Sequence, residues 1–418
     1  GNPFGSSALT EAVIPDSVTT LTGSGIEINS SACTSITIGS GVTDFALFRI
    51  SSNIHVPSLT IKSTTVPTNF SNIFGNNNTP EKIYVPCESL GAYKAAVYNE
   101  GQDPSIVESY VAGCQYVELI KFTATWSDGT VETKPCYTDT ITYNDFTYYY
   151  GDYISDLVVG DCVTAITSSH VNITNLRLSS SVVSITSEDD WYNTVKHYYF
   201  AQNNGLTTIG NNVSTKGLEG DLTLPEGLTT IGDNALMAAG QGYYAETRSG
   251  VTSVSIPSTL TSIGANSLKC TNASAITVDS GNTVYDSRND CNAIIETATD
   301  KLLVGCKSTV IPDDIKSIDD SAFISTSLSV STLTIPSGVT SIGAYAFYEC
   351  SGITEVIIPD ATTTIGNYAF YKYSNSNPNL TSIINATGRS FNWKYIITGS
   401  SGTSSITGTY NDVSVTTE

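Results

Sequence analysis

The residues that most often perform acid–base catalysis are sparse in this chain. It has three histidines, His55, His170 and His197, which lie far apart in the sequence. The sequence contains no HExxH, GxSxG or GxGxxG motif and no phosphate-binding loop, so the common arrangements for metal-dependent hydrolysis, serine chemistry and nucleotide binding are missing. We therefore predict that the protein is not an enzyme, with no catalytic residues and no cofactor.

Paired carboxylates could in principle support sugar hydrolysis or hold a calcium ion. Hydrolysis needs two opposed carboxyl groups about 5–9 Å apart, and Ca²⁺ needs several converging oxygen ligands. The candidates are adjacent acids in expected turns, Asp189–Asp190, Asp313–Asp314 and Asp319–Asp320. Acidic side chains in turns are usually solvated, and the sequence has no EF-hand loop and no calcium-binding nonapeptide. We predict no metal site.

The balance of charges limits the partners. The 418-residue chain has 39 acidic and 18 basic residues and a formal net charge of −21. Binding to nucleic acid or anionic lipid needs clustered Lys and Arg, so we expect neither partner. No stretch approaches the roughly 20 apolar residues of a membrane helix. The beginning of the chain, Gly1–Phe4, has no features of a signal peptide, so we expect that any such peptide has been removed or never existed.

The elements that would position a site follow a repeat of about 23 residues. An apolar–x–apolar–Pro phrase is followed by a polar turn, a second apolar pair that ends in Ile-Gly, and often Ala-Phe. Residues 333–347 read LTIPSGVTSIGAYAF, and residues 356–370 read VIIPDATTTIGNYAF. Pro312, Pro336 and Pro359 are 24 and 23 residues apart. Such regularity predicts a repeat architecture.

Each repeat is expected to form one coil of a parallel β-solenoid. The first and third residues of the apolar trio would point inward and the middle one outward, so that Val13, Thr37, Thr60 and Tyr84 form an outer column. Proline ends the strand because it has no N–H to donate. One coil cannot bury its apolar side alone, whereas stacked coils share a core. We predict a β-rich repeat solenoid in two arrays, with short helical and capping segments.

The coils resemble the BspA-like leucine-rich repeats of bacterial surface proteins of the Bacteroidetes type. The residues that carry the resemblance belong to two repeat phrases, an inserted hairpin coil and a closing helical segment: Val356–Pro359, Ile342–Cys350, Tyr285–Glu296 with Leu302–Cys306, and Ile83–Ala96. The resemblance implies a leucine-rich-repeat-like parallel sheet. It also implies an extracellular or outer-membrane surface location after removal of a signal peptide that is not present in this chain. A lipid anchor upstream of Gly1 is compatible with this expectation.

We predict four segments along the chain. They are a first array with a helical cap, a small β insert, a second array and a C-terminal β cap, at residues 1–115, 116–160, 161–385 and 386–418. Leu90, Tyr93 and Val97 share one helical face and predict the helical cap. Residues 122–133 predict a hairpin with an Asp-Gly turn. Residues 391–397 and 413–415 are interpreted as capping strands.

The nine cysteines form no CxxC pair, which argues against a zinc or thioredoxin-type site. Cys33, Cys270 and Cys350 occupy the same repeat position, and we predict that they are buried thiols. Cys291 and Cys306 flank the inserted hairpin and would face each other if its turn had two residues. They form either a disulfide in an oxidising compartment or two free thiols.

Aromatic residues that interrupt the repeat are the candidate ligand contacts: Trp191, Tyr192, Tyr198, Tyr199, Tyr243 and Tyr244. Insertions in solenoids usually form loops on the binding face, where aromatic side chains anchor a partner. Alternatively, they pack as lids over neighbouring coils. The family resemblance implies recognition or adhesion, with a host protein or glycan bound through the rigid scaffold. The alternatives are a structural spacer or accessory component of a surface complex and, third, a carbohydrate-active enzyme.

Overall fold

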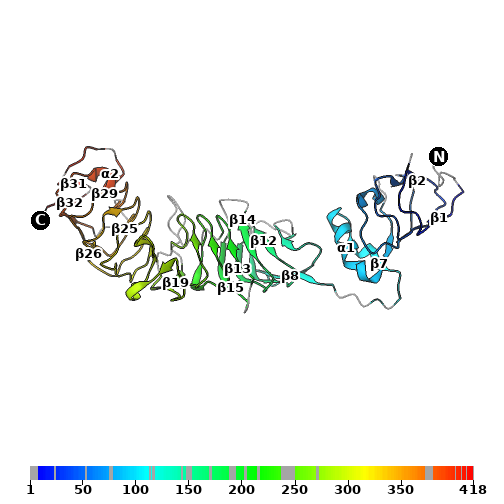
Figure 1. Ribbon diagram of the computed structural model, residues 1–418, viewed down its shortest axis with the longest axis horizontal. Helices are drawn as coiled ribbons and strands as arrows, with labels where there is room; N and C mark the ends of the chain where they lie inside the picture. The colour runs from blue at the N-terminus through cyan, green and yellow to red at the C-terminus, as the bar shows by residue number, and fades with distance from the viewer. Residues whose placement is uncertain are drawn as a thin grey trace. The chain divides into compact units, whose positions relative to one another are not determined.

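The computed structural model (Figure 1) describes the 418-residue chain outside residues 1–7, 23–24, 52–53, 75–78, 113, 115–117, 143–144, 147–152, 169–171, 188–193, 202–204, 214–216, 237–249, 270–272, 372–379, 401, 406, 411 and 418. The chain folds into two compact units. One contains residues 1–121 and 135–139, and the other contains residues 122–134 and 140–418. The four segments predicted from the sequence remain a prediction of domain organisation.

Parallel strands, one from each coil, form the main sheet of the first unit. Their order is β1 (Glu11–Ile14), β3 (Ser35–Ile38), β5 (Ser58–Ile61), β6 (Lys82–Val85) and β7 (Val107–Ser109). A smaller sheet pairs β2 (Ile26–Ile28) with β4 (Phe48–Ile50). Val13, Thr37, Thr60 and Tyr84 are register partners along the main sheet, as predicted. The inward neighbour Ile36 is fully buried, which confirms the alternation.

A helix and a disulfide follow the fourth strand of this sheet. The helix α1 (Leu90–Asn99) buries Leu90, Tyr93 and Val97, and this confirms the predicted helical face. Cys87, before the helix, is bonded to Cys114, after it. The spacing of the cysteines does not predict this pair. In the described part of the chain, no helix is long and apolar enough to span a membrane.

The second unit stacks coils that contribute one strand to each of two walls. One wall of short strands runs β10 (Thr140–Ile141), β12 (Ala165–Ser168), β14 (Ser184–Ser187), β16 (Thr208–Ile209), β18 (Thr230–Ile231) and β20 (Ser262–Ile263). The other wall contains β15 (Thr194–Tyr199), β13 (Asn172–Arg177), β11 (Ile154–Val159), β8 (Ile120–Trp126) and β9 (Val131–Pro135), and then β17 (Glu219–Thr223), β19 (Gly250–Ile256) and β21 (Ala275–Val278).

The first of these coils is covered by the hairpin that the sequence predicts. β8 pairs with β11 in the antiparallel sense and neighbours β9 on its other side. The turn is closed by a hydrogen bond from the N–H of Trp126 to the carbonyl of Thr130 (2.8 Å), and Gly129 has φ 87°. Glycine adopts this left-handed conformation without steric cost. The hairpin thus covers an open strand edge.

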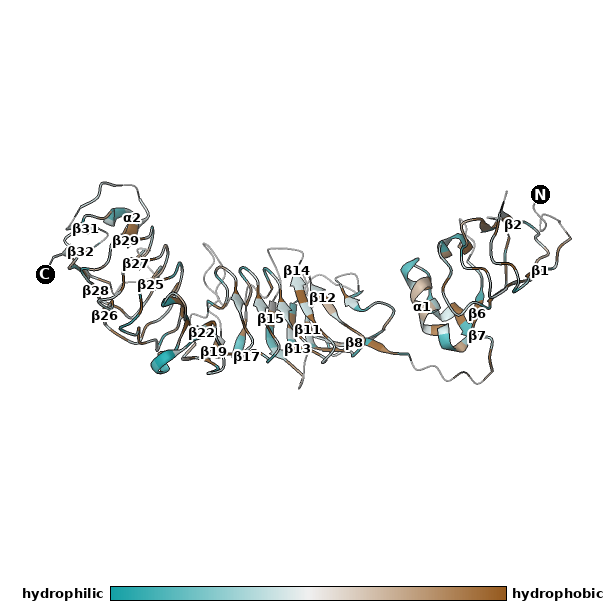
Figure 2. Cartoon of the chain, viewed as in Figure 1, coloured by the Kyte–Doolittle hydropathy of each residue, from teal (hydrophilic) through white to brown (hydrophobic). Residues whose placement is uncertain are grey.

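The last coils of the second unit repeat the two-wall pattern. One sheet runs β22 (Tyr285–Asp286), β23 (Ala293–Glu296), β24 (Lys301–Gly305), β25 (Ser317–Ile318), β27 (Ser341–Ile342) and β29 (Thr364–Ile365). The facing sheet runs β26 (Thr332–Thr334), β28 (Glu355–Ile358), β30 (Ser382–Asn385), β32 (Val413–Thr416) and β31 (Gly408–Tyr410). Figure 2 shows hydrophobic and hydrophilic stretches alternating along the coils, as shared burial of their inner faces requires.

The inserted hairpin of β22, β23 and β24 divides the core of the second unit. Its strands pair in the antiparallel sense, in agreement with the hairpin coil predicted from the resemblance. Ile294 and Val304 pack into the core of the coils before the hairpin, whereas Ile295 and Leu302 pack into the core of the coils after it. Because both faces are covered, the hairpin forms a partition inside the solenoid.

The predicted alternative of a Cys291–Cys306 disulfide is wrong. Both residues are buried free thiols. The hairpin changes register by one residue between Ile294 and Ile295. A one-residue shift turns the following side chains to opposite faces. Cys306 therefore lies beside Asn292, whose carbonyl accepts a hydrogen bond from the Cys306 Sγ (3.3 Å), and the two cysteines belong to different cores.

Two of the three predicted core thiols lie inside the described residues. Cys33 and Cys350 are buried thiols, which confirms the prediction for both. Burial raises the pKa of each thiol, because it removes water from the charged form. Cys270 lies outside the described residues.

The C-terminal cap combines a helix and strands. Val413–Val415 lies in β32, as predicted, but residues 393–398 form α2 (Trp393–Thr398) instead of the predicted strand. The Asn392 side chain accepts a hydrogen bond from the N–H of Tyr395 and caps the first turn, and Gly399 (φ 69°) ends the helix. These caps favour a helix over a strand.

Glycine in the recurring Ile-Gly pair lets successive coils approach closely. A Cβ at Gly343 would lie 2.5 Å from the backbone nitrogen of Asp320, and one at Gly366 would lie 2.3 Å from that of Ala344. No side chain fits at these distances. The need for backbone contact between coils therefore explains why the repeat has glycine here.

Candidate functional site

The sequence-predicted aromatic site is described only in part. Trp191, Tyr192, Tyr243 and Tyr244 lie outside the described residues. The other two candidates, Tyr198 and Tyr199, are adjacent on β15 and point to opposite faces of the strand, as neighbours on a strand must. These two tyrosines therefore occupy different environments.

Of the two described candidates, Tyr199 is the more exposed. Its side chain is 44% exposed, and the Arg177 guanidinium lies over its ring, 4.3 Å from the centroid. The Nε of Arg177 donates to Asp156 (2.9 Å), which holds the guanidinium in place. Tyr198, by contrast, packs against the core and stacks on Phe200 with ring centroids 5.9 Å apart. Tyr198 is thus packed into the solenoid and Tyr199 is exposed, and a role of either residue in ligand contact stays a prediction.

A hollow of about 620 Å³ lies near the beginning of β13 and β15. Tyr153, Asn172, Thr174 and Lys196 contribute to its lining. Lys196 also forms an ion pair with Glu219 on the next strand (2.9 Å). The same two strands, β13 and β15, therefore carry the hollow near their beginning and the Arg177–Tyr199 pair at their end.

The histidines serve separate local contacts. His55 lies 2.7 Å from the Glu81 carboxylate on the surface of the first unit. In the second unit, the Nδ1 of His197 lies 3.0 Å from the carbonyl oxygen of Glu219. His170 lies outside the described residues. Each described histidine thus has a partner of its own.

The acidic pairs of the last coils are engaged by cations and backbone groups. Asp314 pairs with Arg288 (2.8 Å), and Asp319 pairs with Lys301 (2.5 Å). Asp320 accepts a hydrogen bond from the backbone N–H of Ala344 (2.7 Å). Within the described ranges, no three His, Cys, Asp or Glu side chains are grouped so that they could hold a metal ion. Asp189–Asp190 lies outside these ranges.

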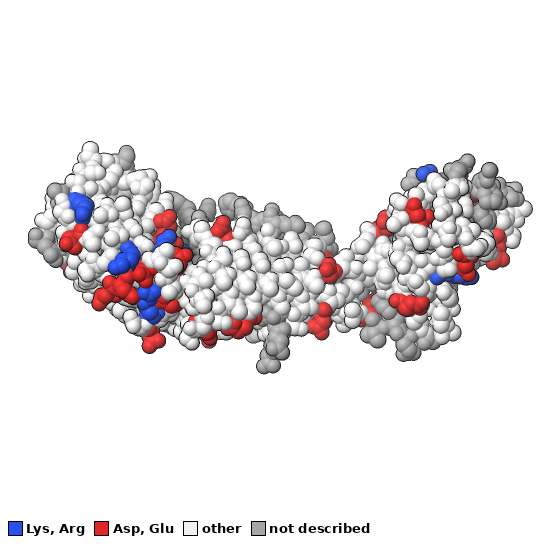
Figure 3. All heavy atoms as spheres, viewed as in Figure 1, with Lys and Arg blue, Asp and Glu red and all other residues white. Residues whose placement is uncertain are grey.

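Arg288 is the centre of an ion-pair network at the hairpin coil. Its guanidinium bonds to the carboxylates of Asp286 (2.6 Å), Asp300 (2.7 Å) and Asp314 (2.8 Å). The hydrogen bond to Asp286 is the main cause of a raised pKa for the guanidinium. Figure 3 shows basic and acidic side chains gathered over these coils and a broad, mostly uncharged surface over the coils around β11–β17. The cations at the hairpin are therefore already neutralised.

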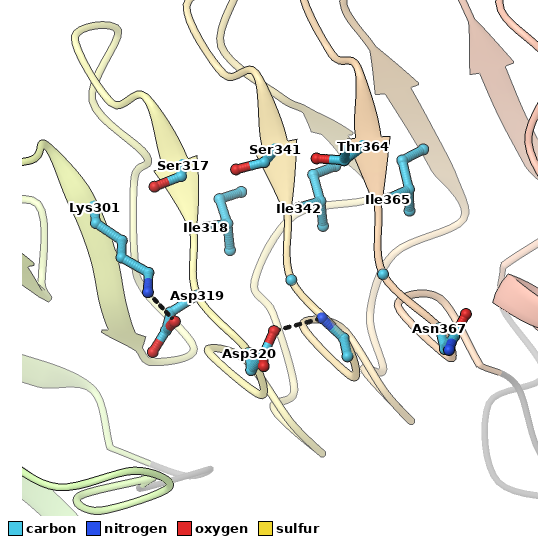
Figure 4. A pocket seen from close by; sticks show the side chains of 13 residues that line it. Lys301, Ser317, Ile318, Asp319, Asp320, Ser341, Ile342, Thr364, Ile365 and Asn367 are labelled. Carbon is cyan, nitrogen blue, oxygen red and sulfur yellow. Dashed lines mark hydrogen bonds and ion pairs between the residues drawn. The ribbon is translucent and has the colours of Figure 1, made fainter.

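A groove of about 640 Å³ crosses β24, β25, β27 and β29 (Figure 4). Ser317, Ser341 and Thr364 are register partners, and their hydroxyls form a row along the groove. In the described part of the chain, these three hydroxyls have no hydrogen-bond partner. The remaining polar lining groups are Lys301, Asp319, Asp320 and Asn367. The groove thus presents free hydroxyls between charged and amide groups.

Stacked tyrosines occupy the turns that follow the groove residues. Tyr345 stacks on Tyr368 (4.8 Å between centroids), and Tyr348 stacks on Tyr371 (4.7 Å). Tyr345 and Tyr368 have φ values of 57° and 58°, a left-handed conformation that disfavours bulky residues. The stacking offsets part of that strain. Burial, as its largest cause, raises the pKa of Tyr348 to about 12.

Sequence reasoning did not identify either feature. Ser or Thr precedes the Ile-Gly pair in almost every coil, so the hydroxyl row has no distinctive sequence signal. The tyrosines do have one, because Tyr345–Tyr348 and Tyr368–Tyr371 share the spacing Tyr-x-x-Tyr in consecutive repeats. A comparison of the repeats with one another would have found the stacked columns.

Comparison with known proteins gives a match to one family model. Residues 142–241, 218–299 and 300–403 match the BspA type leucine rich repeat region, in six copies. A search of curated proteins finds no match.

Solved structures with a similar chain path come from several bacteria. A leucine-rich repeat protein from Eubacterium ventriosum is 21% identical, with 64% of this chain and 70% of that chain covered and a TM-score of 0.43. The pneumococcal vaccine antigen PcpA is 14% identical, with 63% and 79% covered and a TM-score of 0.38. A leucine-rich repeat protein from Bacteroides ovatus is 15% identical, with 90% and 86% covered and a TM-score of 0.27.

Proposed function

The chain belongs to the family of BspA-type leucine-rich repeat proteins, and from this premise we propose that it is a cell-surface recognition protein that binds a host protein or glycan. Leucine-rich repeat proteins of this type are typically non-enzymatic scaffolds, and they commonly bind other proteins. The proposal assigns the binding to exposed groups on the rigid strands of the solenoid.

The Arg177–Tyr199 pair is the observation that carries the proposal. Arginine and tyrosine, together with tryptophan, are the side chains enriched at the energetic centres of interfaces. Here the ring and the guanidinium hold each other at 4.3 Å, and Asp156 fixes the guanidinium from the side. A partner that docks on this pair pays little for ordering it, because both side chains are already held in place.

The disulfide in the first unit supports a location outside the cytoplasm. Disulfides form and persist in oxidising compartments and are rare in the cytosol. The bond between Cys87 and Cys114 spans the helix α1 and is part of the cap of the first sheet. A surface or secreted location agrees with this bond.

An array of host matrix proteins and glycans tests the proposal. The full chain is expected to bind at least one component, and Tyr199→Ala or Arg177→Ala should weaken that binding at least tenfold. Tyr84→Ala is the matched control. Tyr84 lies in the outward column of the first unit and is not part of the Arg177–Tyr199 pair, so its replacement should leave binding unchanged.

The other outcomes are equally informative. Binding that withstands both substitutions would remove the site from the strands β13 and β15. A chain that binds no component would favour a spacer or accessory role. Hydrolysis of any glycan in the array would overturn the non-enzymatic role.

A further inference from the structure

The groove over β25, β27 and β29 has free hydroxyl groups that the fold does not use. Immediately before β27 and β29, the hydroxyls of Thr340 and Thr363 donate to backbone carbonyls of the preceding coil (3.2 and 3.1 Å). Ser341 and Thr364 are the next residues, and their hydroxyls have no such partner among the described residues. One hydroxyl of each Thr–Ser or Thr–Thr pair therefore joins the coils, and the other points into the groove.

The charges of the groove exclude an anionic ligand. Lys301 is the one cation among the residues that line it, and its Nζ is paired with Asp319 at 2.5 Å. Asp320 adds a second carboxylate, which accepts one backbone N–H and is exposed to solvent. A phosphate, sulfate or uronate would approach two carboxylates with no free cation to offset them.

The polar groups of the groove suit a ligand that both donates and accepts hydrogen bonds along a line. Ser317, Ser341 and Thr364 repeat at the spacing of neighbouring strands, about 4.8 Å, and Asn367 adds an amide with one donor and one acceptor group. Of the three isoleucines that line the groove, Ile318 and Ile342 are buried and Ile365 is partly buried, so these side chains present little surface that could form an apolar pocket. Peptide recognition on a sheet usually relies on such pockets or on an open strand edge.

We propose that this groove binds a neutral oligosaccharide, whose hydroxyls pair with the row Ser317, Ser341 and Thr364, with the Asp320 carboxylate and with the Asn367 amide. The proposal rests on the proposed recognition function and names a ligand class and a second surface for it. Carboxylates, amides and hydroxyls together satisfy a polyol, because each sugar hydroxyl donates one hydrogen bond and accepts others. A linear chain of sugars matches the linear arrangement of the groups.

Isothermal titration with linear neutral oligosaccharides tests this site on the full chain. Wild-type protein is expected to bind at least one of a set of neutral gluco-, manno-, xylo- and galacto-oligosaccharides. Asn367→Ala and Ser341→Ala should each weaken binding about fivefold, the loss of one neutral hydrogen bond. Ser341→Phe, which fills the groove, should weaken it by more than about fiftyfold.

A matched control separates local blocking from general damage. Ser262→Phe places the same ring at the same repeat position, before Ile263 and Gly264 on β20, and should leave the affinity unchanged. Circular dichroism verifies that both Phe variants are folded, and Asn367→Ala keeps the test decisive because Asn367 is exposed.

Several results would overturn the proposal. They are no binding of any neutral oligosaccharide, binding that Asn367→Ala and Ser341→Phe leave intact, and binding restricted to anionic glycans or to a basic peptide. If the chain binds a matrix protein through Tyr199 and no neutral sugar, the recognition function stands and the groove assignment fails.

Discussion

Gly305, in the last strand of the inserted hairpin, should tolerate no side chain, because it contacts Phe323, the first ring of a stack with Phe347 and Phe370. A Cβ on Gly305 would lie 2.0 Å from Cε1 and 2.4 Å from Cζ of Phe323. The ring cannot shift freely, because it stacks on Phe347 (4.9 Å), which stacks on Phe370 (5.3 Å). The N–H of Gly305 also donates to the carbonyl of Ala322 (2.9 Å) and holds the strand in place.

The expected cost follows from two opposing effects. Overpacking of a close-packed core costs about 1–3 kcal/mol. Gly→Ala also restricts the unfolded chain, which offsets about 0.4–1 kcal/mol. Gly305→Ala should therefore lower the free energy of unfolding of the second unit by about 1–2 kcal/mol. The measurement is urea unfolding followed by circular dichroism, with hydrogen exchange of residues 300–350 as the local readout.

A double-mutant cycle isolates the contact. Phe323→Leu removes Cε1 and Cζ, the two ring atoms nearest to the added Cβ, so Gly305→Ala should cost less in that background than in the wild type. Phe370→Leu is the matched control, since it shortens a ring of the same stack that does not meet Gly305. The effects of Gly305→Ala and Phe323→Leu on the free energy of unfolding should be non-additive by about 1–2 kcal/mol. The effects of Gly305→Ala and Phe370→Leu should be additive. Equal costs of Gly305→Ala in all three backgrounds would refute the reasoning.

Three further perturbations have defined outcomes. Burial lowers the pKa of Lys269 from 10.5 to about 8. Between these pH values the unfolded chain therefore binds more protons than the folded chain. The free energy of unfolding should rise by up to about 3 kcal/mol from pH 8 to 10.5. Lys269→Met should lack this rise in urea titrations, and equal pH slopes for both proteins would contradict the assignment. Replacing Cys87 and Cys114 by Ala opens a loop with a separation of 27 residues and should destabilise the first unit by about 3.5 kcal/mol, measured by its urea midpoint. An unchanged midpoint would show that the bond does not restrain the unfolded chain. The buried Tyr93 hydroxyl donates to the carbonyl of Ser63 (3.0 Å), so Tyr93→Phe should cost about 1–2 kcal/mol in the same assay. No loss would mean that water satisfies the carbonyl.

Most of the solenoid could be predicted from its repeat, because the pattern encodes the structure one coil at a time. Each apolar–x–apolar trio points its first and third residues inward, and the register of Val13, Thr37 and Thr60 follows from the 24- and 23-residue spacing of these trios. The inserted hairpin interrupts this repeat and was expected from the family resemblance, and its two apolar runs pair in the antiparallel sense as that resemblance implies.

Local details that depend on one residue of register could not be predicted in the same way. The bulge between Ile294 and Ile295 has no sequence signature, and it alone separates Cys291 from Cys306. The helix α2 did have a signature in Asn392 and Gly399, but the apolar residues between them suit a strand equally well. The hydroxyl row of the groove consists of those Ser and Thr side chains that make no hydrogen bond to the preceding coil. Which hydroxyls these are depends on how the coils pack, so the sequence alone does not identify them.

Adhesion of coated beads to host cells tests the central proposal most directly. Beads that carry the full chain should adhere to host cells or matrix in a saturable way, and soluble chain should compete. Beads that carry the Tyr199→Ala variant should adhere less, whereas those with Tyr84→Ala should match the wild type. Adhesion of the wild-type beads that does not exceed that of uncoated beads would contradict a recognition function.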